Sequence, residues 1–180
     1  MHRSKMLCVL VVLMVGGFSS QAAASEGALS VGAEVGYHFE LEEPLIGVNA
    51  RYDFGAAPAV DLGVQGDLNY YFLGSSEFLG ATLRSTVVQF DLNVLATANL
   101  DLIVAPYIGL GAALLYRSTS LESGDNVISS ESSSDLGANL LGGVALELDG
   151  IVRPFGQMRM TFLDGETALS LMVGLNVTVR

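Results

Sequence analysis

The stretch that decides the fold is 106–116, PYIGLGAALLY, which has no charged side chain. The whole chain nonetheless carries a formal net charge of −11. Alternate positions of the stretch separate into a large apolar face (Pro, Ile, Leu, Ala, Leu, Tyr) and a mostly small face (Tyr, Gly, Gly, Ala, Leu). A period of two is typical of a β-strand. Whether the large face meets a protein core or lipid depends on how the other segments alternate.

The first 24 residues form a segment of their own. A basic start with Arg3 and Lys5 precedes an apolar run from Met6 to Phe18, and three alanines end the segment at 22–24. This pattern is typical of a secretory signal peptide, and the run is too short for a spanning helix. We therefore expect residues 1–24 to be a signal peptide and residues 25–180 to form one domain.

The mature chain expected from this cleavage is strongly acidic. Removing 1–24 takes away Arg3, Lys5 and the single cysteine Cys8, which leaves a net charge of −13 and no thiol. Such a chain is not expected to bind nucleic acid or to form disulfides. After Phe18 it has no run of 18 apolar residues, so a helical membrane span is not expected either.

The mature chain alternates with a period of two almost throughout. The eight alternating segments are 29–39, 45–54, 60–72, 85–97, 102–116, 136–147, 152–162 and 168–180. The connections at 55–59, 99–101 and 148–150 are tight, whereas the acidic and longer ones fall on the other side. This asymmetry predicts an up-and-down transmembrane β-barrel of the bacterial outer membrane. The serine-rich segment 117–135 is expected to be a mobile external loop.

The two faces of these segments differ in charge and size. The apolar faces carry no Asp, Glu, Arg or Lys, and most glycines share the opposite face. A soluble lipocalin-type barrel would turn the apolar face inward, whereas a membrane barrel turns it outward. An eight-stranded barrel has room inside only for side chains, so the small residues favour the membrane barrel. Aromatic residues near the segment ends predict a girdle at the two membrane interfaces: Tyr37, Phe39, Tyr52, Phe54, Tyr70, Phe72, Tyr116 and Phe162.

Three stretches resemble strands of the OmpA/OmpX-type small outer-membrane β-barrels: PYIGLGAALLY, VRPFGQMRMTF at 152–162 and LSLMVGLNVTVR at 169–180. The resemblance covers nearly all of 25–180. It implies a monomeric eight-stranded barrel in the bacterial cell outer membrane, inserted by the outer-membrane assembly machinery. Its expected surroundings are outer-membrane lipid and lipopolysaccharide. Chains of this kind usually end in an aromatic residue, whereas this one ends in Val179 and Arg180.

The polar face predicts an ion-pair network inside the barrel. Its charged residues include Glu34, Arg51, Asp53, Asp61, Glu147, Arg153 and Arg159, with Asp67, Asp91 and Arg180 on the same face. Isolated charges would be costly there, so they should pair. The short connection at 41–44 suggests that Glu34 pairs with Arg51, and the turn at 148–150 suggests that Glu147 pairs with Arg153.

The chemistry expected of the chain is limited. His38 is the only histidine of the mature chain, no Ser/His/acid spacing is recognisable, and no metal or cofactor motif is present. We expect no enzyme activity, no cofactor and no metal. The favoured function is a structural or surface-interaction role through external loops. A narrow pore and a lipid-modifying outer-membrane enzyme are the alternatives.

Overall fold

A computed structural model describes residues 27–55, 59–73, 76–78, 81–100, 102–123, 126–148 and 150–179. The expected signal peptide lies outside this range. The described strands are β1 (Ala28–His38), β2 (Glu43–Asp53), β3 (Val60–Tyr71), β4 (Ser76–Phe78), β5 (Ala81–Ala98), β6 (Val104–Ser123), β7 (Asn126–Leu146), β8 (Val152–Leu163) and β9 (Glu166–Val179). The described part of the chain contains no helix long and apolar enough to cross a membrane.

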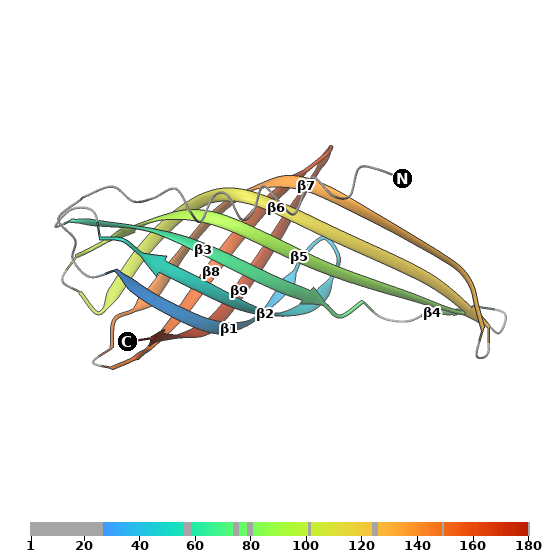
Figure 1. Ribbon diagram of the computed structural model, residues 1–180, viewed down its shortest axis with the longest axis horizontal. Helices are drawn as coiled ribbons and strands as arrows, with labels where there is room; N and C mark the ends of the chain where they lie inside the picture. The colour runs from blue at the N-terminus through green and yellow to red at the C-terminus, as the bar shows by residue number, and fades with distance from the viewer. Residues whose placement is uncertain are drawn as a thin grey trace.

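The eight long strands form a closed antiparallel barrel. Each pairs with its neighbours along the chain, and β1 pairs with β9. Strand β3 pairs directly with β5, although the short β4 lies between them in the sequence. Closure gives every strand a partner on both sides at the level of the barrel, as a bilayer requires. The expected fold class is therefore confirmed. Figure 1 shows the tilted strands wrapping around one axis.

Alternation along each strand sorts the side chains between lumen and exterior. In β1 the exposed Val31 and Val35 flank the buried Glu34, and the same pattern runs around the barrel. Within PYIGLGAALLY, Ile108 and Leu110 are each 67% exposed, whereas Tyr107 and Ala113 are buried. A Cβ on Gly111 would overlap the carbonyl oxygen of Leu92, so this inward position requires glycine. The large face of the stretch is therefore the outer face of the barrel.

The expected loop at 117–135 is wrong. Strands β6 and β7 continue through it as a hairpin in which Arg117 pairs with Ser133 and Ser120 with Ser130. The start of β5 joins them, since Val87 pairs with Arg117. The strand could not be recognised from the sequence because serine makes both of its faces polar, and no apolar residues alternate along it. Its β-structure continues the strand pairing of the barrel.

We call this extension the blade: residues 81–87 of β5, 117–123 of β6 and 126–135 of β7. Figure 1 shows these three strands running well beyond the other long strands at one end of the barrel. Strand β1 begins and β9 ends at the opposite end, where β2 ends as well. The blade end carries the turns expected outside, and the other end carries those expected in the periplasm.

Candidate functional site

The lumen is filled by three layers of side chains. Toward the blade end lies an apolar cluster of Leu45, Tyr71, Val87, Leu115 and Met172, against which Leu41, Leu73 and Leu163 pack. Toward the opposite end lies a second apolar cluster of Leu95, Tyr107 and Leu141. A polar layer separates the two clusters. Among the described residues, apolar side chains thus lie on both sides of the polar layer.

Arg159 is the centre of the polar layer. Its guanidinium is 2% exposed and forms an ion pair with Asp91 through Nη1. Its Nη2 lies 3.6 Å from Glu34 Oε1 and 3.9 Å from Asp67 Oδ1. All three carboxylates are buried. One guanidinium thus lies within ion-pair distance of three carboxylates. Its planar arrangement of N–H donors allows it to bind more than one acceptor.

Amide side chains complete the layer. Asp91 accepts from Gln89 Nε2 at 2.7 Å and from Asn139 Nδ2 at 2.8 Å. Asp67 accepts from Gln65 Nε2 at 2.7 Å and from Asn93 Nδ2 at 3.1 Å. These donors compensate in part for the excess of carboxylate charge, because hydrogen bonds to ionised groups are among the stronger ones.

Asn69 connects two members of the layer. With its amide oriented so that both atoms are satisfied, it donates to Glu34 Oε1 at 2.8 Å and accepts from Arg159 Nη1 at 3.0 Å. Alternation within 60–72 places Asn69 on the same face as Asp61 and Asp67. Its position between a carboxylate and a guanidinium depends on which strands are neighbours, and alternation alone does not give that.

The expected pair of Glu34 with Arg51 is wrong. The β1–β2 turn spans 39–42 instead of the expected 41–44, so Glu34 pairs with Gly47 and Arg51 with Ser30. Arg51 instead holds Asp53 of its own strand, with Nη2 2.8 Å from Oδ1. The same nitrogen donates to Thr97 Oγ1 at 2.7 Å.

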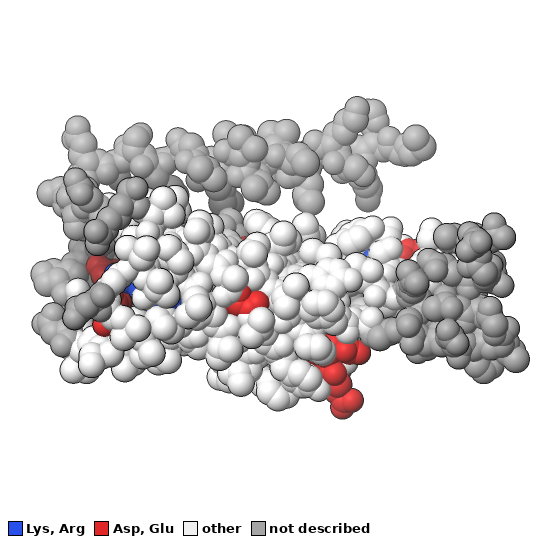
Figure 2. Space-filling view, turned by 90° about the horizontal axis from the view of Figure 1, so that it is seen from below, with Lys and Arg blue, Asp and Glu red and all other residues white. Residues whose placement is uncertain are grey.

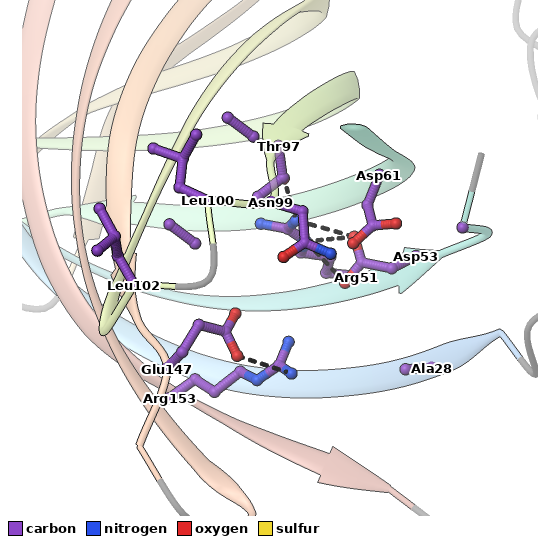
Figure 3. A pocket seen from close by; sticks show the side chains of 13 residues that line it. Ala28, Arg51, Asp53, Asp61, Thr97, Asn99, Leu100, Leu102, Glu147 and Arg153 are labelled. Carbon is purple, nitrogen blue, oxygen red and sulfur yellow. Dashed lines mark hydrogen bonds and ion pairs between the residues drawn. The ribbon is translucent and has the colours of Figure 1, made fainter. Parts of the chain in front are cut away.

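A vestibule opens at the end opposite the blade, with a volume of about 400 Å³. Arg51, Asp53, Asp61, Glu147 and Arg153 all line it. Figure 3 shows two ion pairs on its walls, one between Arg51 and Asp53 and one between Glu147 and Arg153. Arg153 Nη2 lies 3.1 Å from Glu147 Oε2. No ion pair of Asp61 is found among the described residues.

The predicted network is therefore two separate groups. Glu34 and Arg159 meet in the buried polar layer, whereas the other five predicted residues line the vestibule. The guanidinium of Arg51 lies 5.3 Å from the ring centroid of Tyr107, at the floor of the vestibule. That ring belongs to the apolar layer that separates the two groups.

His38 lies inside the blade end of the barrel. Its side chain is buried, and its ring packs edge-on against Tyr71 with centroids 5.2 Å apart. Its Nδ1 accepts a hydrogen bond from the Leu41 backbone N–H at 3.2 Å and lies 3.6 Å from Glu40 Oε2. These contacts fix the ring at the end of the lumen, away from the outer surface of the barrel.

All eight residues of the predicted aromatic girdle are exposed on the outer surface: Tyr37, Phe39, Tyr52, Phe54, Tyr70, Phe72, Tyr116 and Phe162. Three pairs pack edge to face, each between a tyrosine near the end of a strand and the phenylalanine just past that end, and the rings of Tyr52 and Phe54 are 5.1 Å apart. Figure 2 shows that most of one side of the molecule is neither basic nor acidic. Exposed aliphatic side chains cover the wall between the aromatic residues. Such an exterior is stable only against an apolar solvent.

Among the described residues, no group of three or more His, Cys, Asp or Glu side chains could hold a metal ion. The described part of the chain thus offers the polar layer, the vestibule and the blade as its polar features. None of the three combines a nucleophile with a base in hydrogen-bond contact. The arrangement is a barrel with a filled lumen and a sheet that extends beyond it at one end.

Comparison with known proteins gives a fold and no close relative. The sequence matches no protein-family model and no curated protein. Solved structures of several outer-membrane proteins share the fold over most of this chain. A major outer membrane protein from Thermus thermophilus is 16% identical, with a TM-score of 0.65 over 85% of this chain and 99% of that one.

The N-terminal β-barrel domain of Pseudomonas aeruginosa OprF is 11% identical, with a TM-score of 0.61 over 87% of this chain and 99% of that one. Ail, the attachment invasion locus protein of Yersinia pestis, is 16% identical, with a TM-score of 0.60 over 85% and 97%. The fold is also that of an outer membrane enzyme, PagL, at 14% identity and a TM-score of 0.53 over 82% and 98%. The closed barrel, its lipid-facing exterior and these likenesses together show that the chain has the fold of the small eight-stranded β-barrels of the bacterial outer membrane.

Proposed function

We propose that the protein is a sealed outer-membrane barrel with a structural and surface-interaction role, and that the blade is its interacting part. The observation that carries this proposal is the contrast between a filled lumen and a sheet that continues beyond the barrel. A lumen closed by two apolar layers has no path for a solute. The blade, by contrast, presents exposed backbone and side chains from Ser129 to Ser134.

A narrow pore is the weaker alternative. Arg159 and its three carboxylates occupy the middle of the lumen, and apolar side chains lie on both sides of them. Ions would have to cross Leu45 and Tyr71 at one end and Leu95 and Tyr107 at the other. The vestibule ends at this second layer and supplies no continuous water column.

An enzyme activity is also a weaker alternative, although PagL is an enzyme with a similar fold. A lipid-modifying site needs a reactive side chain at the outer surface. His38 points into the lumen, where the Leu41 N–H occupies its Nδ1. No described serine hydroxyl donates to it. We therefore propose a non-enzymatic role that needs no cofactor.

The proposed surroundings follow from the exterior of the barrel. Its apolar belt would contact outer-membrane lipid, and the residues at the base of the blade would contact lipopolysaccharide. The barrel closes on itself, so it needs no second copy to satisfy its backbone in the membrane. We therefore propose a monomer, inserted by the outer-membrane assembly machinery.

Cysteine labelling tests the proposed placement of the blade. In a Cys8→Ser background, Ser132→Cys provides the only thiol, on the blade, and Leu148→Cys provides one at the opposite end. A membrane-impermeant maleimide should label Ser132→Cys on intact cells. It should label Leu148→Cys only after the outer membrane is permeabilised. The reverse pattern would reject the proposed role.

Conductance tests the sealed lumen. Purified folded barrel inserted in a planar bilayer should show no steady ion current. A stable current from the intact monomer would contradict the sealed barrel and favour the pore. A lipid A assay on the same preparation should show no modified product, and a product that depends on His38 would favour the enzyme.

A further inference from the structure

The outer half of β7 has an open edge. Strand β7 pairs with β6 from Asn126 to Leu146, but it pairs with β8 only from Ala138 to Ala145. Among the described strands, none pairs with the other edge of residues 126–137, although the last residues of β8 lie against Gly137. At about 3.3 Å per residue this edge is on the order of 40 Å long. It therefore presents a long row of backbone N–H and C=O groups beyond the membrane belt.

This edge lacks most of the features that usually prevent strand addition, although Glu131 and Asp135 place two acidic charges beside it. Natural sheets protect their edges with proline, lysine, bulges or short strands. Residues 129–136 contain no proline and no lysine. The one register irregularity of the β6–β7 hairpin lies at Leu121/Glu122, near its tip. The side chains from Ser129 to Ser134 are all exposed, so they leave the edge accessible.

The two faces beside the edge differ in charge. Alternation places Ser130, Ser132 and Ser134 on one face, whereas Glu131 and Asp135 lie on the other. On the neighbouring β8–β9 hairpin, Asp164 and Glu166 are exposed. Arg117 is the one cation of the blade whose side chain the structure describes, and its Nη2 lies 3.9 Å from Glu166 Oε2. Among the described side chains, the acidic face of the edge thus lacks a further cation to match Glu131 and Asp135.

The charge of the edge decides between two kinds of partner. A second copy of this chain would bring the same acidic face to the same edge, and like charges across paired strands are destabilising. A basic strand would place its cations beside Glu131 and Asp135. Its opposite face would meet the small hydroxyls of Ser130 and Ser132, which leave room for side chains of any shape.

We propose that the free edge of β7, from Ser129 to Gly137, binds an extended basic segment of another protein by β-strand addition. Lysine or arginine at alternate positions of that segment faces Glu131 and Asp135, and backbone hydrogen bonds hold it to the edge. In this mode the main chain supplies affinity and the alternate side chains supply specificity. The proposal rests on the exposed blade of the proposed function and names the partner that it fits.

Three labelled nonapeptides test it on the full barrel in lipid nanodiscs. The first alternates Lys and Thr, the second alternates Glu and Thr, and the third is the Lys/Thr peptide with every backbone nitrogen methylated. The third keeps the charge but has no backbone N–H to donate from either edge. Fluorescence anisotropy should show binding of the first peptide, with the other two at least tenfold weaker. Equal binding of the methylated peptide would overturn strand addition in favour of adsorption to the acidic rim.

Two matched variants locate the site. Glu131→Gln removes one charge beside the edge, and Glu42→Gln removes one on the β1–β2 turn, which lies on the opposite side of the barrel. Glu131→Gln should weaken the Lys/Thr peptide several-fold, and Glu42→Gln should leave it unchanged. Hydrogen exchange should show new protection of the amides of 129–137 when the peptide is bound. Equal effects of the two variants, or no new protection, would reject the site.

The outcomes separate this inference from the proposed function. If external labelling of Ser132→Cys succeeds and the peptides do not bind, the blade faces outward but the edge is not a basic-strand site. If Ser132→Cys forms disulfide-linked dimers of the barrel and no peptide binds, the edge pairs with a second copy instead. If Ser132→Cys is not labelled on intact cells, the proposed function fails first.

Discussion

Arg159 Nη2 lies 3.6 Å from Glu34 Oε1, although strand β9 separates β8, which carries the arginine, from β1, which carries the glutamate. The two side chains meet by crossing the lumen in front of β9. Glycine lies opposite Glu34 on both neighbouring strands, since Glu34 pairs with Gly174 on β9 and with Gly47 on β2. Side chains from non-adjacent strands therefore hold the barrel wall together from inside.

Removing the central guanidinium should destabilise the barrel strongly. Arg159→Met leaves Glu34, Asp67 and Asp91 buried without their cation, and breaking a buried ion pair costs on the order of 3–5 kcal/mol. Arg153→Met is the control, because its pair with Glu147 is more than one-third exposed, and exposed pairs contribute about 0–1 kcal/mol. Urea unfolding of the refolded barrel in lipid vesicles measures both. Similar losses for the two variants would show that the polar layer does not depend on Arg159.

Glycine should be required at lumen-facing positions where neighbouring atoms leave no room for a Cβ. A Cβ on Gly111 would overlap the Leu92 carbonyl oxygen, whereas one on the outward Gly156 has no atom within 4 Å. Gly111→Ala should cost about 1–3 kcal/mol through overpacking. Gly156→Ala should be neutral or stabilising by about 0.4–1 kcal/mol, because alanine restricts the unfolded chain. The same unfolding assay compares them, and a harmless Gly111→Ala would contradict the crowding.

The sequence predicts the barrel well because one physical signal repeats in every membrane strand. PYIGLGAALLY contains it in full, with Leu110 outside and Gly111 inside. The blade gives no such signal, since Ser132 and Ser133 face opposite sides with the same polarity. Alternation of apolar and polar residues distinguishes the lipid-facing side of a strand from its lumen side. It therefore cannot identify a strand whose two faces both contact water.

The charged residues show the same limit. Alternation correctly places Glu34 and Arg159 in the lumen, but partner choice depends on the stagger of strands around the closed barrel. Arg51 and Asp53 are two residues apart on one strand, and they pair across that short distance. The Glu34–Arg51 prediction failed because the turn lies two residues earlier than expected, at 39–42, which shifts the register of β2 against β1 by four residues.

A cation in the middle of the lipid face should be costly. Leu110 is 67% exposed on the outer wall, near the middle of the barrel part of β6. Leu110→Arg should destabilise the barrel by about 2–4 kcal/mol, because arginine is poorly solvated at the bilayer midplane. Ser118→Arg lies on the same face of the same strand, above the belt, and should change little. If Ser118→Arg costs as much as Leu110→Arg, the belt extends further along the blade than proposed.

Single tryptophans should report the depth of the girdle, because the chain contains no tryptophan of its own. Leu110→Trp places the indole at mid-wall, Phe162→Trp places it in the girdle at the blade end, and Tyr107→Trp places it in the lumen. In vesicles with brominated lipids, bromine deep in the acyl chain should quench Leu110→Trp most strongly. Bromine near the headgroup should quench Phe162→Trp most strongly, since aromatic girdles lie at the interface. Tyr107→Trp should be shielded by the barrel wall from both lipids. Strong quenching of Tyr107→Trp together with weak quenching of Leu110→Trp would reverse the assignment of inside and outside.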